Sequence, residues 1–256
     1  MGFLGQQLEY VAERLSALGY LWRNPSYREV RRSGGARDLY RLLNKPWLRS
    51  DSVATVLDVG ANEGQFLKVA RLLFPSASLL AFEPNAKLLP SLQAVLADSQ
   101  RAAIFGVACG RESTKLPLHR TKFSPATSLL QPTALRIPDF PAVETEDTVE
   151  VAVERIDQIV LNSPLGRAPY LLKVDVQGFE LEVLQGATGI LHDVKVVLLE
   201  VNAVAFYEGQ AGFDEIWKFM REHHFRLIDI GEPIRARATA EVLYFDVAFL
   251  NNAPSG

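Results

Sequence analysis

The chain of 256 residues is long enough for one large domain, with or without an extension, and for a sizeable buried core. Hydrophobic residues make up 48% and charged residues 22%, which is typical of a soluble globular protein and excludes wholesale disorder, collagen and a coiled coil. The net charge of −3 argues against a general nucleic-acid binder, and a single cysteine, Cys109, excludes an intramolecular disulfide and a cysteine-based zinc site.

Residues 1–50 form a basic segment that differs from the rest of the chain. They hold nine Lys or Arg residues against four acids, a net charge of +5, whereas the remainder carries −8. Apolar residues recur at helical spacing over 4–18, and a second short helix is predicted over 38–43. We predict a helical extension over 1–50 that is a solvated cap, a lid over a ligand site or an interface between subunits. A basic amphipathic helix is also suited to an anionic lipid surface.

The second predicted domain, residues 51–256, alternates short apolar strands with helices. The expected strands are 53–59, 78–82, 102–108, 170–176 and 194–201, and the expected helices are 66–74, 87–96, 180–185 and 213–224. This alternation predicts βαβ units in a mostly parallel sheet. Two closing strands, 225–230 and 242–250, are separated by what the sequence presents as a turn, so they should form an antiparallel hairpin.

Residues 113–153 interrupt the alternation with five prolines and several Ser and Thr clusters. We expect a hairpin of residues 115–119 and 148–153 around an irregular loop. A loop of this length in a compact domain is usually functional or mobile.

Nothing in the sequence predicts a membrane span or export. The apolar runs are shorter than the ~18 residues of a membrane span, and residues 1–20 lack the basic start and apolar centre of a signal peptide. We therefore expect a cytoplasmic protein with no transmembrane segment and no nucleic-acid partner.

Four carboxylates follow or end the predicted parallel strands: Asp58, Glu83, Asp175 and Glu200. In an open parallel sheet, ligands bind outside the carboxyl ends of the strands, so these acids should converge on the ligand site. Lys173 lies two positions before Asp175 and therefore on the same face of its strand.

The first turn, Gly60-Ala61-Asn62-Glu63-Gly64, permits a tight bend and a close backbone approach, but it is neither a GxGxxG fingerprint nor a P-loop. Glu83 ends the next strand, where an acid can accept both hydroxyls of an unphosphorylated ribose. This fits either NAD or S-adenosylmethionine. Asp58 would repel a pyrophosphate and suits a cationic amino-acid group, which favours S-adenosylmethionine.

The sequence resembles the FkbM family of S-adenosylmethionine-dependent methyltransferases over about residues 53–250. The residues that carry the resemblance are 56–64 (VLDVGANEG), 81–85 (AFEPN), 172–180 (LKVDVQGFE), 183–187 (VLQGA), 198–200 (LLE) and 246–250 (DVAFL). The resemblance implies a class I methyltransferase fold, which is Rossmann-like, with a seven-stranded, mostly parallel sheet and an antiparallel closing hairpin. It also implies O-methylation of a hydroxyl of a sugar, glycolipid or polyketide-type small molecule. The family usually has Glu where this chain has Gln177, and residues 1–50 lie outside the shared region.

The expected donor-binding residues come from the strand ends, the turns and the irregular loop. They are Asp58, Gly60, Asn62, Gly64, Glu83, Pro84, Asn85, Ala108, Ser128 and Asp175. Asp175 is the first candidate for the base that takes the acceptor proton, followed by Lys173 and Glu200. We expect no metal, although Asp175 and Glu200 could instead hold a divalent ion that acidifies the hydroxyl.

Other residues with reactive side chains receive no catalytic role. Cys109 should be a small wall residue beside the adenine, His192 should lie on the surface, and His119, His223 and His224 are not favoured as catalytic groups.

Two alternative functions stay open. An NAD-dependent oxidoreductase or epimerase would want a third glycine in the first turn and a Tyr-x-x-x-Lys pair, and the chain has neither. A non-catalytic cofactor-binding domain would bind the donor without transferring a methyl group. A homodimer is also possible.

Overall fold

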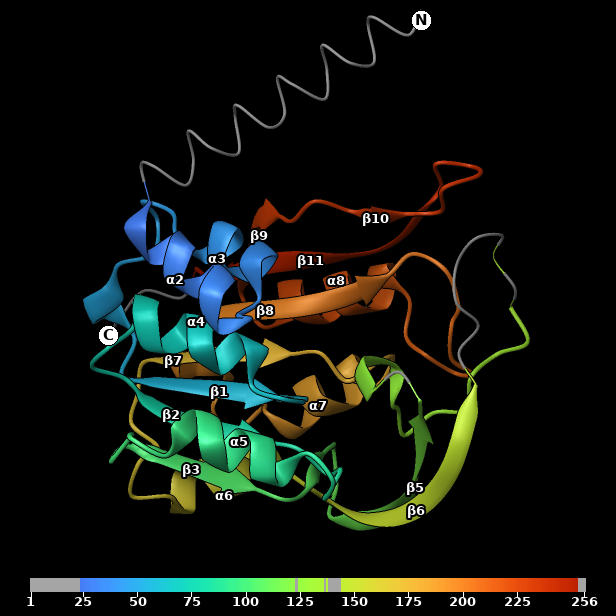
Figure 1. The fold of residues 1–256 in the computed structure, drawn as a ribbon, viewed down its shortest axis with the longest axis horizontal. Coiled ribbons are helices and arrows are strands. Elements are labelled where there is room, and N and C mark those ends of the chain that lie inside the picture. The colour runs from blue at the N-terminus through green and yellow to red at the C-terminus, as the bar shows by residue number, and fades with distance from the viewer. Residues whose placement is uncertain (1–23, 123, 136, 138–143, 253–256) are drawn as a thin grey trace, which may run out of the picture.

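The computed structural model describes residues 24–122, 124–135, 137 and 144–252 (Figure 1). The helix predicted over residues 4–18 lies outside the described residues.

Within the described part of the chain, eight strands form the main sheet, in the order β10–β11–β8–β7–β1–β2–β3 with β9 also paired to β11. The strands are β1 (Thr55–Val59), β2 (Ser78–Phe82), β3 (Ala102–Phe105), β7 (Tyr170–Val174), β8 (Val194–Asn202), β9 (Phe225–Ile230), β10 (Ile234–Arg235) and β11 (Val242–Asn251). Pairing is parallel from β3 to β8, whereas β11 is antiparallel to both β8 and β9. The predicted, mostly parallel sheet with its reversed closing strands is confirmed, and β10 adds an eighth strand to the seven that were expected.

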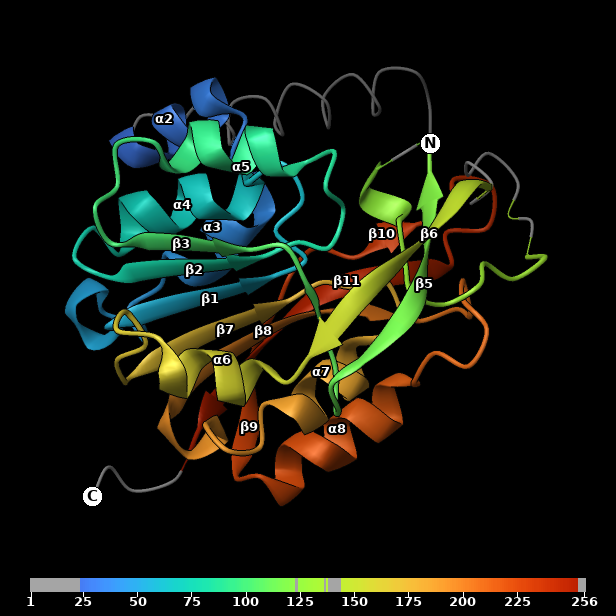
Figure 2. The ribbon, with the colours of Figure 1, turned by 90° about the horizontal axis from the view of Figure 1, so that it is seen from below.

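Helices cover both faces of this sheet (Figure 2). One face carries α2 (Pro25–Ser33), α3 (Arg37–Leu43), α4 (Gln65–Leu73) and α5 (Leu89–Leu96), and the other carries α6 (Ile156–Asn162), α7 (Glu180–Gly186) and α8 (Phe213–Glu222). Because side chains alternate along a strand, Val56 joins the first hydrophobic cluster and Leu57 the second. All five residues of β1 are buried, as expected for a central parallel strand.

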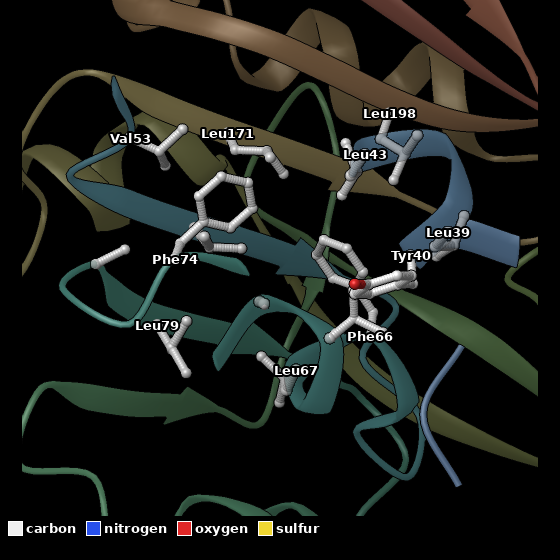
Figure 3. Packing of buried hydrophobic residues seen from close by; sticks show 14 of the residues in the cluster. Leu39, Tyr40, Leu43, Val53, Phe66, Leu67, Phe74, Leu79, Leu171 and Leu198 are labelled. Carbon is white, nitrogen blue, oxygen red and sulfur yellow. The ribbon is translucent and has the colours of Figure 1, made fainter. Parts of the chain in front are cut away.

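The described part of the N-terminal extension is part of the hydrophobic core. Leu39, Tyr40 and Leu43 of α3 pack beside Phe66 of α4 and Leu198 of β8 in one buried cluster (Figure 3). The α2–α3 pair therefore packs on a face of the sheet, and Ala36 and Leu39 also reach the cavity at its carboxyl edge. Whether the extension acts as a lid or as an interface between subunits stays a prediction, and its residues 1–23 lie outside the described residues.

The strand predicted over residues 102–108 is divided between two sheets, so the prediction of one continuous strand was wrong. β3 ends at Phe105, and β4 (Ala108–Cys109) joins β6 (Thr145–Glu154) and β5 (Thr114–Thr121) in a small sheet. Gly106 stands at the break, where a residue without a side chain weakens an edge strand and lets the chain bend away.

β5 and β6 pair antiparallel, which confirms the predicted hairpin. We call residues 110–153 the arm. Figure 1 shows β5 and β6 beyond the arrowheads of β1 and β7, at the carboxyl edge of the main sheet.

Two local features differ from the sequence-based expectations. The closing strands β9 and β11 are joined by residues 231–241, which include β10, rather than by a single turn. Helix α6 was not predicted. It is short, and the irregular composition on both sides of it hid its periodicity.

Candidate active site

A cavity of about 190 Å³ opens at the carboxyl ends of β1, β2 and β7. Its walls come from the ends of β1 and β2, the β3–β4 connection, Leu118 and residues 124–125 and 127–129 of the arm, and the turn after β7, with Ala36 and Leu39 of the N-terminal extension at one side. Eight predicted site residues line it: Gly60, Asn62, Glu83, Pro84, Ala108, Ser128, Lys173 and Asp175. The other four, Asp58, Gly64, Asn85 and Glu200, are not among its lining residues.

Glu83 is fixed at the end of β2 by two backbone donors. The N–H of Asn62 donates to Oε2 at 2.9 Å, and the N–H of Asn85 donates to Oε1 at 2.8 Å. Burial raises the pKa of Glu83, and these two N–H groups oppose the shift. Each oxygen has a further lone pair for a ligand hydroxyl, so Glu83 both ties the two turns together and faces the cavity.

Asp58 and Lys173 form a buried ion pair across β1 and β7, where they are register partners. Lys173 Nζ lies 3.2 Å from Asp58 Oδ1, and it donates to the Gly60 carbonyl oxygen at 2.9 Å. Burial opposes the ammonium form of Lys173, but the carboxylates of Asp58 and Asp175 outweigh it and raise the pKa of Lys173. Lys173 is therefore a fixed cation beneath the cavity.

Asp58 has no exposed surface, and neither of its oxygens receives a well-formed hydrogen bond from any residue that the structure describes. A buried carboxylate in this state retains acceptor capacity for a donor group. Direct contact between Asp58 and a ligand ammonium stays a prediction, because Asp58 lies behind Lys173 and not in the cavity wall.

Gly60 allows the loop after β1 to touch the chain after β7. It has φ +76, and a Cβ built on it would lie 1.9 Å from the carbonyl oxygen of Asp175. Any side chain at this position would separate the two loops that carry the cavity floor.

The turn between β7 and α7 holds Gln177 in a left-handed conformation. Gln177 has φ +58 and is followed by Gly178 at φ +97. The Glu180 carboxylate accepts the backbone N–H groups of Val176 and Gly178, and Ser128 Oγ donates to the Gln177 carbonyl oxygen at 2.7 Å. Burial raises the pKa of Glu180 to about 7, against these hydrogen bonds.

Three acids form a row along the carboxyl edge: Asp175, Glu200 and Asp246. Glu200 and Asp246 are register partners on β8 and β11. Burial, followed by the charges of Asp175 and Asp246, raises the pKa of Glu200. Burial and the charge of Asp175 raise the pKa of Asp246 to about 7. Of the three, Asp175 alone lines the cavity in the described structure.

Gln177 and Tyr207 are hydrogen-bonded to each other beside these acids. Neither residue was assigned a role from the sequence. Gln177 lies between Asp175 and Glu200, and the Tyr207 hydroxyl contacts its amide. Gln177 lies inside the 172–180 motif, so the motif could have marked it as a candidate site residue. Tyr207 reaches the site from the loop after β8, and no motif marks it.

The other reactive side chains have structural surroundings. Cys109 lines the cavity, and burial raises the pKa of its thiol, which keeps the thiol protonated. None of the four histidines, all in the described part of the chain, lines the cavity. His119 is buried with Nδ1 3.2 Å from Thr148 Oγ1, and His223 Nδ1 lies 2.9 Å from the Phe219 carbonyl oxygen.

No group of three or more His, Cys, Asp and Glu side chains in the described ranges is arranged to hold a metal ion. A search of the same ranges finds no helix with the length and apolar character needed to cross a membrane.

Residues 58–227 match the family model for the methyltransferase FkbM domain. The chain belongs to this family. The match covers the strand ends that carry Asp58, Glu83, Asp175 and Glu200, and the expected resemblance is confirmed.

Two curated methyltransferases of other organisms are similar to this chain. The hexuronic acid methyltransferase AglP of Haloferax volcanii is 29% identical over 175 residues, which cover 68% of this chain and 65% of AglP. The 2-O-methyltransferase NoeI of Sinorhizobium fredii is 25% identical over 181 residues, covering 68% of this chain and 71% of NoeI.

A solved methyltransferase FkbM from Methylobacillus flagellatus has the same fold, with a TM-score of 0.50 and 17% identity. The alignment covers 77% of this chain and 44% of that structure. The chain thus spans less than two thirds of the length of AglP and less than half of the solved chain.

Proposed function

We propose that the protein is an S-adenosylmethionine-dependent O-methyltransferase that acts on a hydroxyl of a sugar, glycolipid or polyketide-type small molecule. The observation that carries the proposal is the cavity at the carboxyl edge, with Glu83 fixed at the end of β2 and Asp175 facing the same space. Family membership favours methyl transfer over the hydride transfer of an NAD-dependent enzyme.

The residues around the cavity suit this donor. Glu83 can accept the two ribose hydroxyls because each carboxylate oxygen keeps a free lone pair beside its backbone N–H. Two acids, Asp58 and Asp175, flank the cation Lys173, and this surplus of acids at the floor suits a ligand that carries an ammonium and a sulfonium. Ala108 and Cys109 give a small apolar wall for the base.

When bound, S-adenosylmethionine supplies an activated methyl group. The protein must then align the acceptor hydroxyl and remove its proton. Asp175 is the acid that can accept this proton, because its side chain faces the cavity and is 35% exposed. Lys173 does not serve as the base, because two carboxylates hold it as an ammonium.

Two relatives favour a carbohydrate acceptor, since one is named for a hexuronic acid and the other for 2-O-methyl transfer. Residues of the arm line the cavity, so the arm is suited to contact an acceptor bound beside the donor. A homodimer, a metal-free reaction and a cytoplasmic location remain predictions.

Methyl transfer is tested with radiolabelled S-adenosylmethionine and a panel of neutral glycosides, uronic acids, glycolipids and polyketides. Transfer to at least one hydroxyl compound is expected. Binding of S-adenosylmethionine without transfer to any member would favour the non-catalytic alternative, and no binding at all would overturn the proposal.

Replacement of Glu83 by alanine tests the donor site. Loss of the ribose hydrogen bonds should weaken S-adenosylmethionine binding about 10–100-fold, measured by calorimetry. Some stability should also be lost, because the N–H groups of Asn62 and Asn85 lose their acceptor. Glu63→Ala is the matched control, since Glu63 is an exposed acid of the neighbouring turn. Equal affinity of the two variants would remove the ribose assignment.

A further inference from the structure

The side-chain amide of Gln177 makes hydrogen bonds to three neighbouring side chains. Nε2 donates to Asp175 Oδ1 at 3.0 Å and to Glu200 Oε1 at 2.7 Å. Oε1 lies 2.9 Å from the Tyr207 hydroxyl, which can donate either to it or to the Ala126 carbonyl oxygen at 3.1 Å. The reverse orientation would place the amide oxygen against two carboxylates, so the neighbours fix which end of the amide faces them.

The backbone of Gln177 gives the amide little freedom. A left-handed conformation costs a non-glycine residue roughly 1–2 kcal/mol, and it persists where the surroundings hold it. Here the Ser128 hydroxyl holds the carbonyl oxygen of Gln177, and Glu180 holds the N–H groups on both sides. The turn therefore aims the side chain between β7 and β8.

The bridge separates two acids that would otherwise face each other. Adjacent carboxylates repel, and one of them is then driven to take up a proton. A neutral amide gives one N–H to each acid and adds no charge. Lys173 lies 3.5 Å from Asp175 Oδ2, so both oxygens of Asp175 have a fixed neighbour while the side chain stays open to the cavity.

We propose that Gln177 is a positioning residue for methyl transfer: its amide holds Asp175 in the orientation that accepts the hydroxyl proton, keeps Glu200 apart from it, and is itself oriented by Tyr207. The inference rests on the proposed function, because it assigns a role within that reaction. A residue that acts through Asp175 changes the rate and its pH dependence and leaves donor binding unchanged.

Several ionisable groups besides Gln177's neighbours Asp175 and Glu200 lie close enough to influence the pH dependence of the reaction. The acids are Asp58 on β1, Glu180 on α7, Asp246 on β11 and, acting on Asp246, Asp38 on α3. The cation is Lys173, and Tyr207 and Tyr244 are the phenols whose pKa burial and these acids raise. All of these groups are unchanged when Gln177 alone is replaced.

The test is Gln177→Glu in the full chain, with initial rates followed from pH 5.5 to 9 on the acceptor found by the panel. The variant removes the donors to both acids and adds a third carboxylate of the same shape. We expect kcat at pH 7 to fall about 10-fold or more, and the acidic limb of the pH–rate profile to move up by about one pH unit. The dissociation constant of S-adenosylmethionine should stay within about 2-fold.

Tyr207→Phe tests the second part of the inference. The amide remains but loses the donor that orients it, so kcat should fall by a smaller factor, about 3-fold or more, with KM nearly unchanged. Gln158→Glu is the matched control, because it adds the same charge on the exposed side of α6 and should change neither kcat nor the pH profile.

A Gln177→Glu enzyme with the wild-type kcat and pH profile would overturn the inference. A readout without turnover separates this failure from that of the proposed function: carbon-13 NMR of the Glu200 carboxyl, titrated in the folded wild type and in the variant. The titration should move to higher pH in Gln177→Glu. If the wild type transfers no methyl group, the proposed function fails. The Glu200 titration still tests the inference in that case, because an unchanged titration in Gln177→Glu would show that Gln177 does not influence Glu200.

Discussion

Asp175 and Glu200 both contact the Gln177 amide, but their surroundings suit them to different tasks. Asp175 faces the cavity with 35% of its side chain exposed and has Lys173 at 3.5 Å. Burial and the charges of Asp175, Asp246 and Glu180 raise the pKa of Glu200, and Glu200 does not line the cavity in the described structure. We therefore propose that Asp175 accepts the acceptor proton and that Glu200 supports its position.

Asp175→Asn should lower turnover by about 10²-fold or more, because an amide cannot accept the hydroxyl proton. The variant should still fold, since an amide oxygen can accept the hydrogen bond from Gln177. Single-turnover transfer measures the effect, with donor affinity by calorimetry as the check on binding. Turnover within a few-fold of wild type would move the role of base to another residue, with Glu200 the next to test.

The sequence allows the carboxylates to be placed but not the bonds between them. Glu83 and Asp175 could be predicted to face one site, because parallel strands present their carboxyl ends at the same edge. That Asp58 would pair with Lys173 behind the wall depends on strand register, which periodicity does not give. Tyr207 could not be predicted, because the path of a long loop brings it to Gln177.

At the scale of elements, α3 shows that the N-terminal extension has a structural task. Leu43 is 1% exposed and packs with α4 and β8 in the first hydrophobic cluster. A chain that begins near Asp51 would lose α2 and α3 and leave this cluster open to water, so we expect it to unfold rather than to retain donor binding.

Leu43→Ala should reduce the free energy of unfolding by about 2–5 kcal/mol, because it leaves a cavity under α3. Leu161→Ala is the matched control: Leu161 is 64% exposed on α6, and its replacement should change stability by no more than about 0.5 kcal/mol. Urea titration measures both. Equal effects of the two substitutions would contradict the packing of α3 as part of the core.

The long apolar strands and the longer helices could be predicted from periodicity, whereas the element boundaries around the arm could not. β4 has two residues and pairs with β6, which lies far along the chain. Its existence depends on that pairing, and no local pattern encodes it. The short β10 depends in the same way on β11.

For the whole molecule, buried acids determine how stability depends on pH. Asp246 and Glu180 both have a pKa raised to about 7 in the folded state. The unfolded chain releases these protons near pH 4, so between about pH 4 and 7 the folded state binds more protons and the free energy of unfolding falls as pH rises. The lowered pKa values of Asp51 and Asp147 act below this window.

Asp246→Asn should reduce this dependence, because an amide does not titrate. Wild-type protein should be more stable at pH 5 than at pH 8, and the difference in unfolding free energy should shrink in the variant by an amount of the order of 1 kcal/mol. Denaturant titrations at the two pH values measure it, with exposed Asp98→Asn as the control. A variant that keeps the full wild-type difference would show that Asp246 does not carry it.

The arm enters and leaves the domain at one place, because Ala108 and Cys109 of β4 lie beside Val153 and Glu154 at the end of β6. A segment whose ends meet can change in length and sequence at little cost, since only the short closure between its ends has to be kept. Residues 124–125 and 127–129 of the arm line the cavity, and Ser124 and Ser128 are hydrogen-bonded to Asn62 and to the Gln177 carbonyl oxygen. Residues 130–133 and Ile137 are tied as well, since Thr133 bonds the backbone of Ala205 and Phe206, and Leu130 and Ile137 pack against the cluster of Phe206 and Leu243. The exposed part of the β5–β6 hairpin is therefore where we expect an insertion or exchange to leave the main sheet and the proposed donor pocket in shape.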